Sequence, residues 1–349
     1  MDVLLGCAET LNPCVTRLRK ALDEHDRVDR VRHDLEVFWA GDPDVDVLHL
    51  QWPRALFPNW QDPTEKDLER LRSQLKHWGR SARIVTTIHN IRAHDRSQGP
   101  LFDELYRLVY KESDGFIHMG SVSRDLLRDA YSLSEKEETI IPHGWYDTLP
   151  DEVSQTKARG ELGIPEEAAL AVVFGALRSP EEVTLIREGV RRWANPRKQV
   201  LIAGRLTWPN HRLHDRVARG YHRLRTLFLP VTFRFGRFAD NKVQYFLRAA
   251  DVLLIPRLRI LNSGDVPLGF TFSRVVVGPN EGVIGEILKE TGNLTFDPDI
   301  PSSVATALQK GYERQQRGLG ESNRRYAARE MNWRTVAEQH VAFYTGEQS

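Results

Sequence analysis

Short apolar runs that alternate with polar, helix-period stretches are the feature that most limits how this chain can fold. In the first half the runs are residues 2–6, 46–50, 83–88, 115–119 and 138–142. In the second half they are residues 169–175, 199–204, 231–236, 251–256 and 274–279. Short β-branched and aliphatic runs separated by helices are typical of buried parallel strands. The pattern therefore predicts an α/β fold with two sets of about five parallel strands.

The length of 349 residues suits two domains. Residues 149–163 are polar and end in a helix stop, so we place a boundary near residue 150. The expected domains are residues 1–150 and residues 151–330. Residues 331–349 are expected to form an amphipathic helix, which either packs on the second domain or crosses back to brace the first.

The composition excludes several classes of protein. With 49 basic and 48 acidic residues the net charge is +1, which argues against binding to nucleic acid. No apolar run approaches the roughly 18 residues of a membrane span, and the N-terminus lacks the basic region of a signal peptide. Cys7 and Cys14 are too few for a disulfide framework. We expect a cytoplasmic protein, with peripheral contact to the inner face of a membrane as an option.

Polar side chains follow most of the predicted strands of the first half. Open parallel sheets bind ligands at the carboxyl ends of their strands, so these residues are candidates for one shared site. They follow successive strands in the order Gly6, then His49 with Gln51 and Trp52, then His89 with Asn90, then His118, then His143.

Glycine followed by arginine recurs at the strand ends of the second half. Glycine lets the backbone approach a ligand closely, and arginine offers a fork of donors to a phosphate. The candidates are Gly175 with Arg178, Gly204 with Arg205, Gly236 with Arg237, and Arg257 after Pro256. Asn262, Ser263 and Gly264 open a predicted helix whose free N–H groups suit a diphosphate. An anionic ligand is therefore predicted here, although Arg205 and Arg237 are equally consistent with solvated surface residues.

Other familiar sites are missing from the pattern. His89 and His94 have no matching Cys or third His, so no zinc site is expected. No G-x-G-x-x-G follows the first strand, and neither a Walker A loop nor a G-x-S-x-G elbow is present. We therefore predict no metal and no cofactor.

Several segments together resemble a known family. They are HLQWP (49–53), TIHNIRAHD (87–95), DGFIHMGSVSRDLL (114–127), IIPHGWY (140–146), FGALRSPEEV (174–183), FADNKVQYFLRAADVLLIPRLRILNSG (238–264) and RVVVGPNEGVIGEIL (274–288). In this order they resemble GT-B glycosyltransferases, and more narrowly the bacterial exopolysaccharide and glycolipid enzymes related to the retaining family four. The resemblance implies two Rossmann-like domains facing a central cleft. It also implies metal-independent sugar transfer from a nucleotide-diphosphate donor, of the GDP-mannose or UDP-hexose type, to a glycolipid, polysaccharide or small-molecule hydroxyl.

The resemblance assigns roles to the candidate residues. For the donor it implies Gly175, Arg178, Arg205, Arg257, Asn262, Ser263, Gly264 and Glu281. For the acceptor it implies His49, Gln51, Trp52, Asn90, His118 and His143. For catalysis it implies His89, with Asp95 and His94 as further candidates for a general base. An inverting enzyme needs such a base, whereas a retaining one can pass the proton to the leaving phosphate, and the sequence leaves both open.

The chain departs from the family pattern at two places. A lysine usually follows the first arginine by three or four positions, where this chain has Glu181 and Glu182. The family's Glu-x7-Glu pair would fall on Ile260 and Leu268, and the LNSG form resembles a subgroup that replaces this motif. Glu281 and Glu286 are the remaining acids nearby. Two alternatives stay open: a GT-B sugar epimerase or phosphorylase, and an inactive GT-B domain that binds a nucleotide sugar or a partner enzyme.

Two surface features bear on the acceptor. Residues 17–33 carry six basic side chains, interpreted either as a solvated helix face or as a contact for anionic lipid headgroups. Residues 52–60 are rich in aromatic side chains. This loop is expected either to pack into the core, or to stack on an acceptor sugar or dip into a membrane interface.

Overall fold

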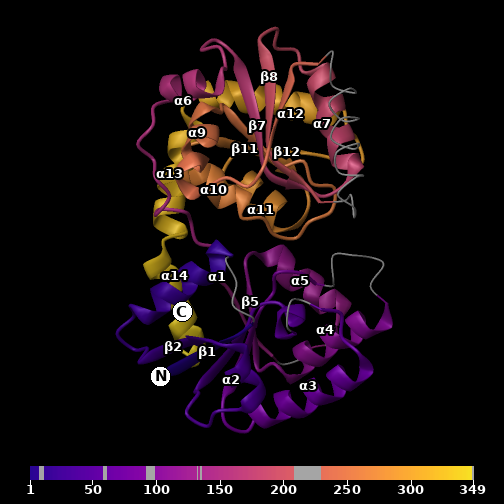
Figure 1. The fold of residues 1–349 in the computed structure, drawn as a ribbon, viewed down its shortest axis with the longest axis vertical. Helices are drawn as coiled ribbons and strands as arrows, with labels where there is room; N and C mark the ends of the chain where they lie inside the picture. Colours follow the sequence, from indigo (N-terminus) through magenta and orange to yellow (C-terminus); the bar gives the residue numbers. More distant parts are fainter. Residues whose placement is uncertain are drawn as a thin grey trace. The chain divides into compact units, whose positions relative to one another are not determined.

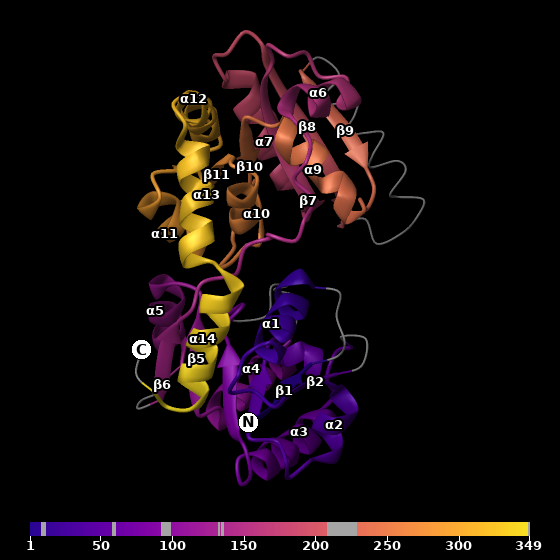
Figure 2. The same cartoon turned by 90° about the vertical axis from the view of Figure 1, so that its left-hand side faces the viewer.

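Two compact units make up the computed structural model (Figures 1 and 2). The structure describes residues 1–7, 12–57, 61–91, 99–131, 133, 136–207 and 229–347. The first unit is Met1–Gly144 with Glu330–Ser349, and the second is Trp145–Arg329. The chain thus first passes from one unit to the other after residue 144, a few residues before the predicted boundary near residue 150. Helix α14 (Trp333–Tyr344) belongs to the first unit, so of the two placements considered for the last helix the structure has the return to the N-terminal half.

The first unit is built on a parallel sheet with strand order β2-β1-β3-β4-β5-β6 in the described part of the chain. Every neighbouring pair of these strands runs parallel. The sheet's switch in strand order lies between β1 and β3, where ligands bind in open α/β sheets. The strands are β1 (Asp2–Gly6), β2 (Arg30–His33), β3 (Val47–Leu50), β4 (Arg83–Thr87), β5 (Gly115–His118) and β6 (Glu137–Ile140).

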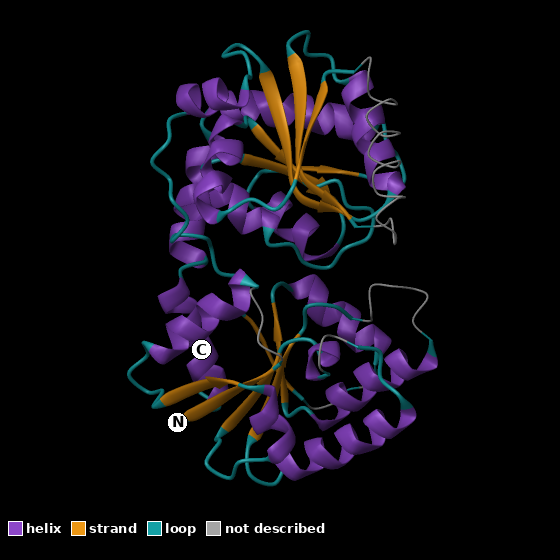
Figure 3. Cartoon of the chain, viewed as in Figure 1, coloured by secondary structure: helices purple, strands orange, loops and turns teal. Residues whose placement is uncertain are grey.

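Helices cover both faces of this sheet (Figure 3). On one face Trp78 of α3 donates its indole N–H to the Phe38 carbonyl of α2, at 2.9 Å. On the other face α14 packs beside α1, and Phe343 of α14 lies directly over Gly115 of β5. The elements are α1 (Pro13–Asp23), α2 (Leu35–Ala40), the 3-10 helix η1 (Pro53–Leu56), α3 (Glu65–Trp78), α4 (Pro100–Glu112) and α5 (Ser121–Ala130), together with α14.

The second unit has a parallel sheet with the order β12-β11-β10-β7-β8-β9 among its described strands. This is the doubly wound order, and its switch point lies between β7 and β10. The strands are β7 (Ala169–Leu177), β8 (Lys198–Leu206), β9 (Val231–Phe235), β10 (Val252–Leu254), β11 (Val275–Pro279) and β12 (Leu294–Phe296). The helices are α6 (Gln155–Leu162), α7 (Pro180–Arg192), α9 (Asp240–Ala249), α10 (Asp265–Thr271), α11 (Gly282–Glu290), α12 (Ser303–Gln316) and α13 (Leu319–Glu330).

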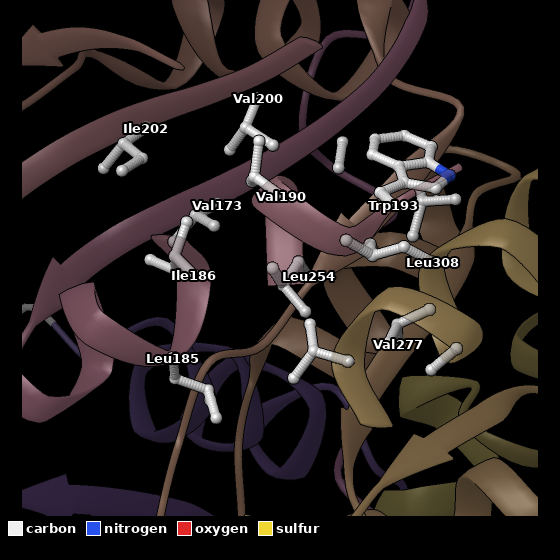
Figure 4. Close-up of a cluster of buried hydrophobic side chains, with 14 of the residues drawn as sticks. Val173, Leu185, Ile186, Val190, Trp193, Val200, Ile202, Leu254, Val277 and Leu308 are labelled. Carbon is white, nitrogen blue, oxygen red and sulfur yellow. The ribbon is translucent and has the colours of Figure 1, made fainter. Parts of the chain in front are cut away.

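The core of the second unit lies between this sheet and helices α7 and α12 (Figure 4). Trp193 at the end of α7 is 1% exposed, and its indole N–H donates to Gln309 of α12 at 3.0 Å. Along β7, Val173 faces this core while Phe174 faces the opposite side, where its ring lies 5.9 Å from that of Phe246 in α9. Alternation along the strand therefore serves two helical layers at once.

The predicted fold class is confirmed: this is an α/β chain with two parallel sheets. Each of the ten apolar runs overlaps a strand, and two further strands, β2 and β12, lie at sheet edges. In β2, whose sequence is Arg-Val-Arg-His, only Val31 is buried, and β12 has three residues. Neither segment has an apolar run long enough to mark it as a strand, whereas the edge strands β6 and β9 do have such a run.

Residues 17–33 do not form a single solvated helix face, because only residues 17–23 are helical. Helix α1 ends at Asp23, and β2 begins at Arg30. Four of the basic side chains form ion pairs with acids of this chain: Lys20 with Glu24, Arg27 with Glu347, Arg30 with Asp2, and Arg32 with Asp42. Contact of this segment with anionic lipid headgroups stays a prediction. Within the described ranges, no helix has the length and apolar character to cross a membrane.

The aromatic segment that begins at Trp52 packs inward where the structure describes it. Ala55, Leu56 and Phe57 are at most 2% exposed, and Trp52 stacks on His89. Of the two interpretations, core packing applies to Pro53 and to residues 55–57, whereas Trp52 is only half-buried. Residues 58–60 lie outside the described residues.

Gly204→Ala is expected to destabilise the second unit by at least about 2 kcal/mol. A Cβ at Gly204 would lie 1.5 Å from the carbonyl oxygen of Gly175 on the neighbouring strand, so the two strands would have to separate. The measurement is urea unfolding followed by tryptophan fluorescence, to which the buried Trp193 of this unit contributes. The control is Gly160→Ala in α6, where nothing lies within 4 Å of the new Cβ. It should stabilise the protein by up to about 1 kcal/mol. Equal stability of Gly204→Ala and the parent would contradict the strand contact.

Candidate functional site

The backbones of β7 and β8 approach each other closely at the carboxyl ends of the two strands. Gly175 has a φ of +93°, a conformation that side chains other than glycine rarely adopt. Gly204 lies beside it in register, with no room for a side chain between the two backbones. The chain continues from here to Arg178, next to the switch point of the sheet.

A buried ion pair joins the ends of β7 and β10 at this switch point. Nη1 of Arg257 donates to both carboxylate oxygens of Glu182, at 2.8 and 2.7 Å, and Nη2 donates to the Ala176 carbonyl at 2.7 Å. Arg257 is 6% exposed and Glu182 is 4% exposed. Glu182 lies in the first turn of α7, where the helix dipole favours a negative charge. Because each buried charge compensates the other, removal of either one would be costly.

Arg178 is held by its backbone and leaves its side chain exposed. Its N–H donates to the Glu182 carboxylate at 2.7 Å, and its guanidinium makes no hydrogen bond within the described ranges. Partial desolvation, followed by the like charge of Arg257, lowers the pKa of Arg178 below its ordinary value. The group stays protonated at neutral pH, since an arginine is charged far above that pH. The exposed cation of this pair is therefore Arg178.

The predicted turn before α10 forms, and it includes an acid that the sequence analysis did not single out. Asp265 follows Gly264, and its N–H donates to the Ser263 hydroxyl at 3.2 Å. That hydroxyl donates in turn to the Asp265 carboxylate at 3.2 Å. Burial raises the pKa of Asp265, while Arg257, Ser263 and Arg178 act in the opposite direction. The two arginines, the serine and this carboxylate thus form one electrostatic cluster.

Among the described residues, the side chains of Arg205 and Glu281 form no hydrogen bond or ion pair with this cluster. Arg205 is exposed near the end of β8. Glu281 precedes α11 and forms an ion pair with Arg259, which also contacts Asp299 at 3.2 Å. Asn262 is half-buried just before the turn. The structure therefore gathers Gly175, Arg178, Arg257, Ser263 and Gly264. Arg205 lies beside Ala176 on the neighbouring strand, and Glu281 is paired with Arg259.

In the first unit, Gln51 and Trp52 hold the imidazole of His89. Nε2 of His89 lies 2.8 Å from Oε1 of Gln51, and Trp52 stacks on the ring at 4.2 Å between centroids. An amide oxygen only accepts, so Nε2 carries the proton and Nδ1 is the acceptor nitrogen. Burial lowers the pKa of His89 to about 3, with a smaller effect from His143. At neutral pH this is a neutral imidazole in a single tautomer.

His49 and His118 were expected to contact an acceptor, but the structure places both in the core. Each is 0% exposed. His49 lies within β3, and its ring nitrogens contact the hydroxyls of Thr87 and Tyr344, both at 2.7 Å. His118 is the last residue of β5 and contacts Ser123 at 3.0 Å. A side chain inside a buried strand points into a helical layer rather than beyond the sheet edge.

The other first-unit candidates are more accessible. Asn90 and His143 are half-buried. The Asn90 carbonyl accepts from the Tyr110 hydroxyl at 2.7 Å, and Nδ1 of His143 donates to the Gly144 carbonyl at 2.6 Å. Asp95 and His94 lie outside the described residues.

Three groups in this first unit were missed by the sequence analysis: Thr87, His340 and Tyr344. Thr87 belongs to the β-branched pattern of its strand, and nothing in that pattern distinguishes it from a purely structural residue. His340 and Tyr344 lie far along the chain from His49. In the part of the chain that the structure describes, no three His, Cys, Asp or Glu side chains lie close enough to hold a metal ion.

Acidification is expected to destabilise the first unit selectively. Burial lowers the pKa of His89 to about 3, and the pKa values of His118 and His340 to about 4. In the unfolded chain a histidine has a pKa of about 6.5. Between pH 6.5 and 4 the unfolded state therefore binds protons that the folded state does not, so the unfolding free energy falls with pH. The fall is up to about 1.4 kcal/mol per histidine and pH unit.

Hydrogen exchange followed by mass spectrometry at pH 7 and pH 5, corrected for intrinsic rates, measures this effect in each unit. Protection should fall in β1 and β4 and persist in β7 and β8. The control is His77→Gln at an exposed position of α3, which should keep the pH dependence of the parent. A parallel loss of protection in both units would show that these histidines are not the cause.

Comparison with known proteins supports the fold. No protein-family model and no curated protein matches the sequence. Sucrose-phosphate synthase from Thermosynechococcus elongatus is similar in structure, with a TM-score of 0.75, 16% identity, and 99% and 98% of the two chains covered. HepE from Anabaena, solved with UDP-glucose, has a TM-score of 0.72 and 13% identity, with 99% of each chain covered. A glycosyltransferase from Rickettsia africae has a TM-score of 0.71 and 12% identity, with 99% of this chain and 98% of that chain covered. With its two parallel six-stranded sheets, the chain has the GT-B fold of two Rossmann-like domains.

Proposed function

We propose that this chain transfers a sugar from a nucleotide-diphosphate sugar to an acceptor hydroxyl. The observation that carries the proposal is the pair of guanidinium groups, Arg178 and Arg257, at the switch point of the second sheet. Open α/β sheets bind ligands at this place, and arginine suits phosphate oxygens. UDP-hexose is the first donor to consider, because HepE, with the same fold, was solved with UDP and with UDP-glucose. GDP-mannose is the second.

In this proposal the two arginines have different tasks. Arg178 is exposed and contacts the diphosphate directly, while Arg257 is fixed by Glu182 and contributes its charge from behind. Gly175 permits close backbone approach, and the Ser263–Gly264 turn offers a hydroxyl and N–H groups. Arg205, Asn262 and Glu281 are proposed for the outer part of the donor, with Glu281 on sugar or ribose hydroxyls. Charge stabilisation by arginine makes a metal unnecessary for the departing diphosphate.

The first unit is proposed to bind the acceptor, with His89 at the reacting group. The acceptor oxygen forms a bond to the anomeric carbon, the bond from that carbon to the diphosphate oxygen breaks, and its electron pair leaves with the nucleoside diphosphate. In an inverting reaction the hydroxyl proton goes to a base, for which Nδ1 of His89 is proposed, with Asp95 and His94 as alternatives. In a retaining reaction it goes to the leaving phosphate. The anomeric configuration of the product distinguishes the two.

The acceptor is proposed to be a sugar, a glycolipid or a growing polysaccharide. Trp52 presents an aromatic face next to His89, and Asn90 and His143 add polar groups on the same strand-end edge. Aromatic faces next to hydrogen-bonding groups suit sugar rings. Exopolysaccharide or glycolipid synthesis on the cytoplasmic side of a membrane is the setting that fits such an acceptor.

A second candidate is a domain that binds a nucleotide sugar without turning it over. The positions expected for two carboxylates hold Ile260 and Leu268, which are 8% and 6% exposed. The position expected for a lysine holds Glu182, whose charge is already used by Arg257. Release of free UDP or GDP in the presence of acceptor sugars separates the two candidates, because only an enzyme produces it.

Binding of the donor is tested by thermal shift with UDP, GDP, TDP, ADP and their sugar conjugates. A ligand at one hundred times its dissociation constant adds about 2.7 kcal/mol to the unfolding free energy. Arg178→Ala is expected to weaken binding of the stabilising nucleotide by about 1.5–3 kcal/mol, the range for a hydrogen bond to a charged group. The matched control is Arg191→Ala, at the other end of α7, where the arginine pairs with Glu188 at 3.5 Å. Unchanged nucleotide affinity in Arg178→Ala would place the donor elsewhere.

His89→Gln is expected to lower kcat by about 10²–10⁴-fold and to leave nucleotide affinity within about twofold of the parent. The reason is that His89 lies in the first unit, whereas the proposed phosphate contacts lie in the second. Initial rates and thermal shifts on the same preparation give both quantities, and His77→Gln is the control. A wild-type rate would remove His89 from the mechanism.

A further inference from the structure

A buried chain of hydrogen bonds joins the C-terminal helix to His89. The Tyr344 hydroxyl of α14 lies 2.7 Å from Nδ1 of His49. Nε2 of His49 lies 3.1 Å from the amide nitrogen of Gln51, whose amide oxygen lies 2.8 Å from Nε2 of His89. Tyr344, His49 and Gln51 are at most 4% exposed. Away from water, each of these polar atoms depends on the next for its hydrogen bond.

The chemistry of the amide sets the direction of the whole chain. The Gln51 oxygen only accepts, so His89 donates from Nε2. The Gln51 nitrogen only donates, so Nε2 of His49 accepts from it, and the Thr87 hydroxyl lies 2.7 Å from the same ring nitrogen. His49 therefore carries its proton on Nδ1 and donates to the Tyr344 oxygen. Donation runs one way, from His89 to Tyr344.

We infer that Tyr344 is a positioning residue for His89, acting through His49 and Gln51. By accepting from Nδ1 of His49, its hydroxyl selects the tautomer of His49 that holds the Gln51 amide with the oxygen toward His89. His89 then keeps its proton on Nε2 and presents Nδ1 as the acceptor nitrogen. The inference rests on the proposed function only for its catalytic consequence, because the tautomer of His89 is a property of the free protein.

Loss of the Tyr344 hydroxyl is expected to reverse the direction of donation along these hydrogen bonds. Nδ1 of His49 would then lose its acceptor, and the proton would move to Nε2, which can donate to Thr87. The Gln51 amide would turn so that its oxygen faces the new N–H and its nitrogen faces His89. His89 would accept at Nε2 and carry its proton on Nδ1. One hydroxyl near the C-terminus thus decides which nitrogen of His89 carries the proton.

The neighbouring imidazole of His340 does not compete for these partners. Its ring lies 5.6 Å from that of His49 and 6.0 Å from that of Tyr344. Its Nδ1 donates to the Val336 carbonyl within α14, at 2.7 Å. Burial lowers the pKa of His340 to about 4, so the ring is neutral at neutral pH. The chain from Tyr344 to His89 therefore carries no net charge from this neighbour.

The Tyr344 hydroxyl can be separated from the packing of α14. Phe343 over Gly115 and the contact of α14 with α1 hold the helix on the sheet. Tyr344→Phe keeps the ring that packs edge-on against His49 at 5.6 Å. The variant therefore removes the hydrogen bond while it leaves the apolar contacts in place.

The test is the state of the ring nitrogens of His89, read by NMR on protein labelled with ¹⁵N-histidine. The signals of His89 are assigned by their loss in His89→Gln. In the parent Nε2 should show the shift of a protonated nitrogen, and in Tyr344→Phe the protonated nitrogen should be Nδ1. The kcat of sugar transfer should fall by about 10-fold or more, with nucleotide affinity unchanged. The control is Tyr326→Phe, which removes a hydroxyl that lies 3.3 Å from Glu290 in the second unit and should change neither signal nor rate.

A second variant restores the original state. In Tyr344→Phe, the additional change Gln51→Glu supplies a carboxylate, which at pH 8 only accepts and so favours a proton on Nε2 of both histidines. The double variant should return the His89 proton to Nε2. Identical His89 nitrogen shifts in the parent and in Tyr344→Phe would overturn the inference. If no nucleotide sugar reacts or binds, the proposed function fails, while the nitrogen shifts still decide the inference.

Discussion

Parallel strand pairing is the constraint on which the rest of this structure depends. Consecutive parallel strands need a crossover between them, so helices cover both faces of each sheet and the strands become buried and apolar. The same pairing sends all carboxyl ends to one edge. Arg178 and Arg257 meet there, although β8, β9 and α9 separate them in the sequence, because β7 and β10 are neighbours at the switch point. The candidate donor site is therefore a consequence of topology before it is a consequence of any local motif.

Charge compensation decides which group at this edge can take a ligand. Glu182 uses the charge of Arg257, while Arg178 gives the Glu182 carboxylate only its backbone N–H. The exposed positive charge is thus that of Arg178, next to the buried carboxylate of Asp265, whose pKa burial already raises. A bound diphosphate would raise that pKa further through like-charge repulsion. Proton uptake at Asp265 on donor binding would then relieve the repulsion, so an acid beside the phosphates is compatible with the site.

The sequence was sufficient for features that have a local cause. Apolar runs marked every central strand, and Gln51, His89 and Arg178 lie just after strands, as predicted. The edge strands β2 and β12 were not predicted, because Arg30–His33 is mostly polar and β12 has only three residues. The direction in which a strand side chain points was not predicted either. His49 was therefore expected to contact an acceptor, although it points into a helical layer. The partner of His49 is 295 residues away, and no periodicity connects such positions. In the sequence, Glu182 was notable only because it stands where the family usually has a lysine. Its ion pair could not be predicted, because its buried partner Arg257 follows a strand far along the chain.

The return of the chain to its first unit connects these findings. Helix α14 covers the face of the first sheet that carries His49, and without it the imidazole and the Gly115 backbone would face water. Water would satisfy either nitrogen of His49 equally well, so the Gln51 amide would lose its reason to keep one orientation. The first half of the sequence thus contains His89, Gln51 and Trp52 but not the group that fixes their proton arrangement. That group arrives with the last residues of the chain, so the single tautomer of His89 belongs to the complete unit and not to the N-terminal segment alone.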